Sequence, residues 1–393
     1  MYDVYSIRED FPVLKEVVYL DSAATTQTPI QVVLAMEDYF YKYAGNHGRG
    51  AHRLARQTTN HYEDARESVA SFLNTDYKKT IFTKNTTESI NMVAHGIKWK
   101  SGDHIITTLI EHHSNLLPWM RLREQGVEVT IINPDEYGII NPNDVKEAMT
   151  DKTRLVAITH ISNVFGSIQD VGRIVKIAHK GGAQVLIDGA QSAGHMPLDV
   201  GALDCDFFAT SGHKGLLGPQ GTGVLYVKEP DMLAPTYVGG GTVHAVTSTG
   251  FELEPSPAKF EAGTPNIPGV IGLGCAVEYV LELGTADIER HETALAKDAA
   301  RRLAEMDLVE VYGPQDRAGV VPFNVVGLNA HDVAMILDET KKICVRSGHH
   351  CAMPSIQFLK VEGAARASFG LYTTQEEVDL FVDSVSQITT LVT

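Results

Sequence analysis

Short apolar runs alternate with amphipathic stretches over most of residues 80–227. The runs are rich in β-branched residues and nearly continuous in apolar character, which is typical of parallel strands buried on both faces. Most intervals are long enough for a crossover helix, so we predict a mostly parallel, doubly wound α/β sheet flanked by helices. The last run follows its predecessor closely and is a candidate antiparallel strand. The predicted strands are Thr80–Thr83, His104–Leu109, Val127–Ile132, Arg154–Thr159, Gln184–Asp188, Asp206–Thr210 and Gly223–Val227.

The pattern changes after a proline-rich stretch, Phe251–Gly269, where we place a domain boundary. Beyond it we predict helices, isolated strands at Val320–Val326, Lys342–Arg346 and Ala365–Phe369, and a final helix from about Gln375. A chain of 393 residues exceeds one ordinary hydrophobic core. The expected organisation is a large domain over residues 16–262 and a smaller α+β domain over residues 263–393, with residues 1–15 packing against the smaller domain.

Composition and charge exclude several classes of protein. No apolar run approaches the roughly 18 residues of a membrane span, and the amino terminus lacks the features of a secretion signal. We therefore expect a cytoplasmic protein without a membrane partner. The net charge of −16 argues against a nucleic-acid partner. The four cysteines lie far apart without a Cys-x-x-Cys pair, which disfavours a disulfide framework or a structural zinc site.

The most informative chemistry is the combination of Lys214 with Asp188. Asp188 ends a predicted buried strand, and Ser211-Gly212-His213-Lys214 follows the next strand. Both therefore lie at the carboxyl edge of the sheet, where ligands of such sheets bind. An amine that forms an imine and a carboxylate that keeps a pyridine nitrogen protonated are what pyridoxal phosphate (PLP) chemistry requires. The sequence thus predicts a PLP enzyme.

Other polar residues converge on the same edge. Asn85 is predicted to cap a helix together with Glu88 in a capping box, so that Thr86 and Thr87 offer donors to a phosphate. An imidazole after another strand is suited to stack on a pyridine ring and to transfer protons. The further candidates at this edge are Ser211, His213, His112, Gln191 and Asn163.

A second cluster is the loop Arg346-Ser347-Gly348-His349-His350-Cys351-Ala352. A cysteine beside histidines and an arginine gains thiolate character, and the thiolate is the nucleophilic form. We interpret Cys205, Cys275 and Cys344, which lie in apolar runs, as inert thiols. The alternative for this loop is a metal site, with His112 or His113 as a further ligand. A lysine-imine site with one nucleophilic thiol explains more residues, so we predict no metal.

With these motifs the chain resembles the cysteine desulfurase and selenocysteine lyase family of class V aminotransferase-like enzymes, in its SUF-type branch. The resemblance runs nearly end to end, from Asp10-Phe11-Pro12-Val13-Leu14 and Tyr19-Leu20-Asp21-Ser22-Ala23-Ala24 to Arg366-Ala367-Ser368. It is most specific in Ser211–Lys214 and Arg346–Ala352. It implies fold type I of PLP enzymes, with a mostly parallel seven-stranded sheet, a homodimer, and L-cysteine as the substrate.

The resemblance also implies a role for each candidate residue. Lys214 would form the Schiff base and the Cys351 thiolate would attack the substrate sulfur, while Arg346 would order the cysteine loop. Contacts to the PLP ring are implied for Asp188, Gln191 and His112. Contacts to its phosphate are implied for Thr86, Thr87, Ser211, His213 and, across a dimer interface, Thr264. Asn163 and Arg366 would bind the substrate carboxylate, and His52 would lie near the site.

The implied reaction converts L-cysteine to L-alanine and leaves a persulfide on Cys351. The sulfur would pass to a SUF-type acceptor protein for iron–sulfur cluster assembly. Selenocysteine lyase and cysteine sulfinate desulfinase use the same lysine and cofactor, so both stay open as alternatives. An aminotransferase gives no reason for the loop thiol. From a different class, a non-catalytic scaffold or metal-binding protein is the remaining alternative.

Overall fold

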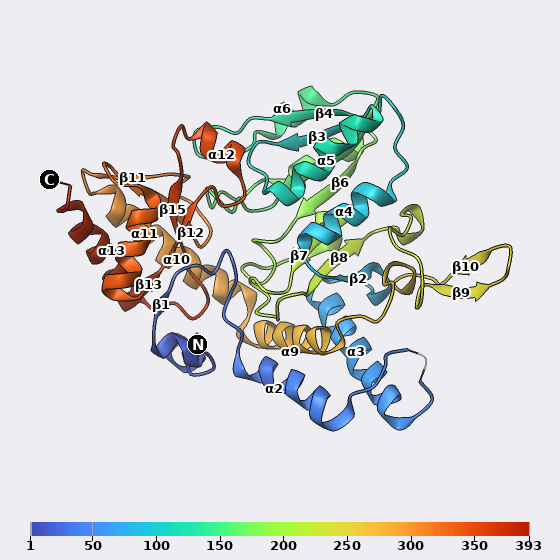
Figure 1. Ribbon diagram of the computed structural model, residues 1–393. Helices are drawn as coiled ribbons and strands as arrows, with labels where there is room; N and C mark the ends of the chain where they lie inside the picture. The colour runs from blue at the N-terminus through green and yellow to red at the C-terminus, as the bar shows by residue number, and fades with distance from the viewer. Residues whose placement is uncertain (1, 49, 393) are drawn as a thin grey trace.

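The computed structural model describes residues 2–48 and 50–392, and in this part of the chain the largest element is a seven-stranded sheet (Figure 1). The strand order is β2-β8-β7-β6-β5-β3-β4, in which β8 runs antiparallel to both neighbours and the other pairings are parallel. The predicted sheet and its antiparallel last strand are therefore confirmed. The bounds are β2 Thr80–Thr83, β3 His104–Thr108, β4 Glu128–Ile132, β5 Thr153–Thr159, β6 Gln184–Asp188, β7 Phe207–Ser211 and β8 Gly223–Val227.

The two faces of this sheet are buried in two different cores. In β5, Val156 and Ile158 enter the core that contains α3, α7 and α9, whereas Leu155 and Ala157 face the core that contains α4 and α5. Successive side chains of a strand point to opposite faces, so a continuous apolar run is needed to fill both cores. The helices are α2 Ile30–Asp38, α3 Arg53–Phe72, α4 Thr86–Gly96, α5 Leu117–Arg121, α6 Pro142–Ala148, α7 Val171–Lys180, α8 Val200–Leu203 and α9 Ile267–Leu283.

The C-terminal part builds a separate four-stranded antiparallel sheet, in the order β11-β12-β15-β14, within the described residues. It shares its core with α10, α11 and α13, and it lies beside the large sheet in Figure 1. The bounds are α10 Thr285–Ala304, β11 Val309–Val311, β12 Val320–Val325, α11 Ala330–Lys341, β14 Arg346–Gly348, α12 Met353–Phe358, β15 Ala364–Ser368 and α13 Gln375–Thr389.

The predicted single strand Lys342–Arg346 is wrong. Residues Ile343–Cys344 form β13, which pairs in parallel with β1 (Val18–Tyr19), and the last residue of the run, Arg346, begins β14. The chain thus passes from one sheet to another within this run. The partner of β13 comes from the far end of the sequence, so no local pattern indicates the break.

Helix α9 follows the predicted boundary at residue 263 but packs on α2 and α3. Its buried side chains, such as Leu273 and Val277, lie in the first core of the large sheet. The C-terminal core contains Leu20 from the amino-terminal segment, and its other buried residues begin on α10, at Leu295. At the amino terminus, α1 (Val4–Arg8) contacts the C-terminal part, because Arg8 Nη1 pairs with Glu377 Oε2 at 2.9 Å.

A hairpin of β9 (Val243–Val246) and β10 (Phe251–Leu253) extends away from the large sheet (Figure 1). Only its second strand, β10, falls inside the stretch Phe251–Gly269 where the sequence predicts a boundary. In the described residues, no single helix has the length and apolar character to cross a membrane. The pair α9 and α10 meets that requirement only when the two are joined across a 77° bend.

Candidate active site

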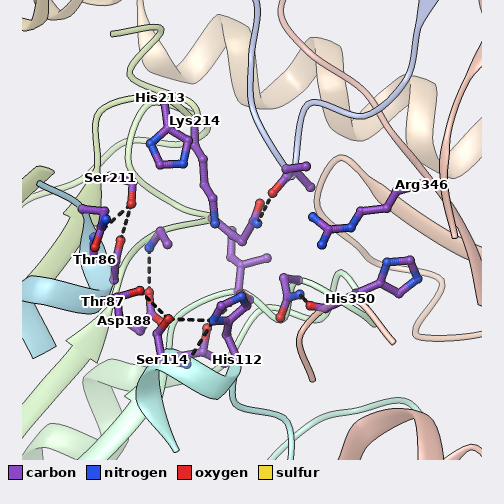
Figure 2. A pocket seen from close by; sticks show the side chains of 18 of the residues that line it. Thr86, Thr87, His112, Ser114, Asp188, Ser211, His213, Lys214, Arg346 and His350 are labelled. Carbon is purple, nitrogen blue, oxygen red and sulfur yellow. Dashed lines mark hydrogen bonds between the residues drawn. The ribbon is translucent and has the colours of Figure 1, made fainter. Parts of the chain in front are cut away.

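A cavity of about 250 Å³ lies at the carboxyl edge of the large sheet. Figure 2 shows Lys214 pointing across it, with Ser211 and Thr86 on one side and Arg346 on the other. Every strand from β2 to β7 other than β4 is followed by a residue that lines the cavity, and the C-terminal part closes it. The structure brings together these predicted site residues: Thr86, Thr87, His112, Asn163, Asp188, Gln191, Ser211, His213, Lys214, Arg346 and Arg366.

Lys214 and Asp188 are the buried charged pair of this cavity. Asp188 ends β6, and its Oδ1 accepts a hydrogen bond from the Ala190 N–H at 2.9 Å. Burial raises the pKa of Asp188, whereas that N–H and the charge of Lys214 act against the rise. Burial also lowers the pKa of Lys214 to about 8, with Asp188 acting in the opposite direction. A lysine with such a pKa has a substantial fraction of free amine near neutral pH, which is the nucleophilic form.

A group of donors surrounds the amino terminus of α4. The Asn85 side chain accepts from the Glu88 N–H and so caps this helix as predicted. Glu88 reaches the Lys84 N–H instead of Asn85, so the predicted capping box is not closed. Thr86 donates its N–H to Ser211 Oγ at 3.0 Å, which joins the helix to the end of β7. A helix amino terminus with hydroxyl groups beside it is suited to bind a phosphate.

His213 lies at the same end of the cavity and has an unused polar atom. Its Nδ1 is buried without a hydrogen-bond partner among the described residues. Burial, together with the charge of Lys214, lowers the pKa of His213 to about 4. A buried polar atom without a partner is costly, so an anionic or polar ligand group beside it would relieve this cost.

His112 is held as a neutral imidazole on the opposite wall. The Ser114 N–H donates to His112 Nδ1 at 3.1 Å, which leaves the proton of the neutral ring on Nε2. Burial, and next the charge of Lys214, lower the pKa of His112 to about 3. Ser114 Oγ also lies 2.6 Å from Thr87 Oγ1, so it connects the two predicted residues.

Arg366 and Asn163 form the wall toward the C-terminal part. Arg366 is buried; its Nη1 donates to the Asn163 carbonyl at 2.9 Å and its Nη2 to Asp21 Oδ1 at 3.0 Å. Its Nε has no partner among the described residues. Asn163 Nδ2 donates to the His350 carbonyl at 2.8 Å, which ties the cysteine loop to this wall.

Cys351 lies on an exposed loop and does not itself line the cavity. Arg346 Nη2 lies 3.7 Å from its Sγ. His350 and Cys351 both have positive φ, 52° and 55°, a conformation that costs energy in residues other than glycine and is concentrated at functional sites. The loop is anchored by the His113 N–H, which donates to the Cys351 carbonyl at 2.7 Å. Burial raises the pKa of the other three thiols, Cys205, Cys275 and Cys344.

Besides Cys351, two predicted residues do not line the cavity of the same chain. Thr264 lines a separate groove of about 550 Å³ with Arg66 and Glu261. His52 is the N-cap of α3, where its Nδ1 accepts from the Ala55 N–H. The sequence resemblance implies that Thr264 acts across a dimer interface. Its position in a single chain does not test that expectation, which stays a prediction.

Three residues of the site were missed from the sequence. Ser114 lies two positions after His112, and its place near a predicted residue was an available signal. Glu111 is fully buried and accepts from the Thr159 N–H at 3.0 Å. Asp21 pairs with Arg366, which is 345 positions away; no local pattern reveals such a contact.

The residues present fit pyridoxal phosphate. A lysine with a lowered pKa and a buried carboxylate face one cavity, and an unpartnered imidazole nitrogen and threonine hydroxyls lie at the amino terminus of α4. These are the groups that such a cofactor needs for its aldehyde, its pyridine nitrogen and its phosphate. Among residues 2–48 and 50–392, no three His, Cys, Asp or Glu side chains are grouped to hold a metal ion.

Comparisons with known proteins agree with this chemistry. Residues 18–381 match the family described as Aminotransferase class-V. A probable cysteine desulfurase of Methanothermobacter thermautotrophicus is 47% identical over 388 residues, 97% of each chain. The apo structure of a cysteine desulfurase from Thermococcus onnurineus has a TM-score of 0.95 at 44% identity, with 98% of each chain covered. The cysteine desulfurase CsdA of Escherichia coli, in an S-sulfonic acid form, has a TM-score of 0.92 at 38% identity, with 100% of this chain and 99% of that one covered.

Proposed function

Because the chain belongs to the class-V aminotransferases and, within them, to the cysteine desulfurase family, we propose that it is a PLP-dependent enzyme that removes sulfur from L-cysteine and releases L-alanine. The observation that carries this proposal is the position of Lys214 and Asp188 in one cavity with the anchored Cys351 loop beside it. A transamination reaction would not need that thiol.

Pyridoxal phosphate, when bound, supplies an electron sink that makes the α-proton of an amino acid acidic. Lys214 is the residue that would hold it covalently, and Asp188 would keep its pyridine nitrogen protonated. Ser211, Thr86, Thr87 and His213 would bind the phosphate, since they gather at the amino terminus of α4. Gln191 would contact the ring, and His112 would stack on it as a neutral imidazole.

The α-proton of the substrate would move to Lys214 Nζ, because a pKa of about 8 lets this amine accept and return protons near neutral pH. Arg366 and Asn163 would orient the substrate carboxylate. The guanidinium of Arg366 is fixed through Nη1 and Nη2, while its Nε has no partner among the described residues; a guanidinium offers the charge-assisted hydrogen bond that a carboxylate prefers.

The Cys351 thiolate would attack the substrate sulfur. An S–S bond forms as the C–S bond breaks, and the electron pair of the broken bond stays with the carbon, which takes up a proton on the way to alanine. The sulfur remains on Cys351 as a persulfide. Arg346, 3.7 Å from Sγ, would favour the thiolate.

The exposed position of Cys351 supports transfer of that sulfur to an acceptor protein, which we propose to be of the SUF type and to serve iron–sulfur cluster assembly. We propose a homodimer in which Thr264 of one chain reaches the phosphate of the other, and in which His52 approaches the site. The division into residues 1–15, 16–262 and 263–393 is also part of the proposal, with α9 as a connecting helix that packs on the larger unit.

The test is the release of alanine from L-cysteine by the purified protein with PLP. We expect Cys351→Ser to bind the cofactor as the wild type does and to lose alanine release, and Cys275→Ser, a matched thiol outside the cavity, to retain it. Equal rates for Cys351→Ser and the wild type would overturn the role of the thiol. Comparison with selenocysteine and cysteine sulfinate as substrates separates desulfuration from the two alternative activities.

A further inference from the structure

The chemistry above does not use the buried ion pair between His195 and Glu292. His195 Nδ1 lies 2.8 Å from Glu292 Oε2, and the two side chains are only 11% and 3% exposed. His195 follows β6 in the turn after Asp188, and Glu292 lies on α10 in the C-terminal part. The pair therefore joins the segment that carries Asp188 to a helix of the second core.

The imidazole of His195 lies directly against the backbone that follows Lys214. A Cβ added to Gly215 would lie 2.6 Å from His195 Cδ2 and 2.8 Å from its Nε2, and one added to Gly194 would lie 2.0 Å from the Gly215 carbonyl oxygen. These separations leave no room for any side chain at either glycine. The turn of His195 thus supports the Lys214 segment by direct contact.

One ring nitrogen of His195 remains available on this side. Its Nε2 is buried and has no hydrogen-bond partner among the described residues. It borders a cavity of about 10 Å³ that Gln191 and Gly319 also line. A space of that size holds about one water molecule, so a water between Nε2 and the Gln191 side of the cavity would satisfy the nitrogen.

The charge of Glu292 determines the protonation of the ring. Burial disfavours the imidazolium, but the charge and hydrogen bond of Glu292 outweigh burial, so the pKa of His195 is raised even against the repulsion of Lys214. The proton on Nδ1 is fixed by Glu292, and the second proton, on Nε2, faces the Lys214 segment. A positive ring at this position disfavours the ammonium form of the lysine.

We propose that His195 and Glu292 are positioning residues for Lys214: the ion pair, packed against Gly215, fixes the backbone that carries the lysine and places a positive ring beside that backbone, which favours the free amine over the ammonium form. This inference rests on the proposed function, because that function requires a reactive amine at Lys214. It goes beyond the proposed function by assigning a role to His195 and Glu292. The C-terminal part would then influence the position and protonation of Lys214 through α10, as well as through the cysteine loop.

Other charged groups also face Lys214, and the test must separate His195 from them. They are Asp188, Arg366, Arg346 and Cys351, with the rings of His112 and His213. The variants therefore leave all of these unchanged. Glu292→Gln keeps a hydrogen-bonding side chain but removes the charge, and His195→Gln removes the ring. His179→Gln is the matched control. His179 lies on α7, where its Nε2 pairs with Asp206 Oδ2 at 2.9 Å.

The readout is the pH dependence with which Lys214 reacts with a small acylating reagent, measured by mass spectrometry on the full chain after removal of the cofactor. In the wild type we expect a midpoint near pH 8. In Glu292→Gln and His195→Gln we expect a rate at pH 7 about threefold lower, since the ammonium form is favoured, and in His179→Gln no change. Unchanged Lys214 profiles in the folded variants would overturn the proposal.

A second measurement does not depend on the Glu292→Gln variant. Histidine ring resonances of the wild type, assigned by comparison with His195→Gln, should show that His195 stays protonated as the pH passes 6.5, the ordinary value of this side chain. A neutral ring at that pH would contradict the inference even if Glu292→Gln failed to fold. Neither measurement needs bound PLP. A failure to bind the cofactor would therefore refute the proposed function, whereas the two measurements test the role of His195 and Glu292 independently.

Discussion

Arg366 Nη2 donates a hydrogen bond to Asp21 Oδ1 across 3.0 Å, and the two residues lie 345 positions apart in the chain. Arg366 belongs to β15 and Asp21 follows β1, so the contact joins the two ends of the sequence at the wall of the cavity. Burial raises the pKa of Asp21, and the charge of Arg366 acts against this rise. The pair sets the direction of a guanidinium that we expect to bind the substrate.

Asp21→Asn should raise the KM for L-cysteine about tenfold, which is about 1.4 kcal/mol of binding, with a smaller effect on kcat. The amide keeps the shape of the side chain but no longer fixes the guanidinium by charge. Steady-state kinetics measure the effect, and Asp38→Asn, which breaks an exposed ion pair with Lys42, serves as the control. An unchanged KM in Asp21→Asn would argue against a substrate role for Arg366.

Arg346→Gln should slow the alkylation of Cys351 by iodoacetamide by about three- to tenfold at pH 7. The guanidinium lies 3.7 Å from Sγ, and a nearby cation favours the reactive thiolate. Peptide mass spectrometry follows each thiol separately, so half-buried Cys275 provides an internal control within the same sample. If Cys351 reacted equally fast in both proteins, the arginine would have no influence on the thiol.

Glu111 should make the stability of the protein depend on pH. Burial raises its pKa to about 8 from an ordinary value of 4.5, so the folded state binds more protons than the unfolded state between these values. The free energy of unfolding therefore falls as pH rises through this window. Relative to Glu111→Gln, the wild type should lose on the order of a few kcal/mol between pH 5 and pH 8. Denaturant titrations at several pH values check this, and parallel curves would show that Glu111 does not titrate there.

Gly194→Ala should destabilise the protein by about 3 kcal/mol or more, because the new Cβ would lie 2.0 Å from the Gly215 carbonyl oxygen at a φ of +87°. Gly182→Ala isolates the backbone effect, since Gly182 has a φ of +81° but nothing within 4 Å of its Cβ position. We expect that control to cost about 1 kcal/mol. Equal losses of unfolding free energy in the two variants would mean that the turn at Gly194 does not pack closely against the Lys214 segment. Thermal or denaturant unfolding gives both values.

The large sheet was predictable from the sequence because each strand is a local signal. The runs that end at Thr159 and Asp188 must fill two cores, and this requirement makes them apolar throughout. Their polar ends converge because the carboxyl ends of parallel strands share one edge. The gathering of Lys214, Asp188 and Ser211 around one cavity follows from this geometry.

The remaining features depend on contacts between distant segments. The pairings Asp21 with Arg366 and His195 with Glu292 join residues 345 and 97 positions apart, and the residue patterns around them contain no trace of the partner. The split between β13 and β14 has the same origin, since β1 provides the partner of β13. Only the folded chain reveals these contacts.

The most direct test of the central claim is the visible absorption spectrum of the protein with pyridoxal phosphate, compared between the wild type and Lys214→Ala. We predict that the wild type shows a visible band of bound cofactor that survives gel filtration and is trapped on Lys214 by borohydride. Lys214→Ala should lack the trapped adduct and release no alanine from L-cysteine. A wild-type protein that stays colourless with added cofactor, or a Lys214→Ala variant with full activity, would contradict the account.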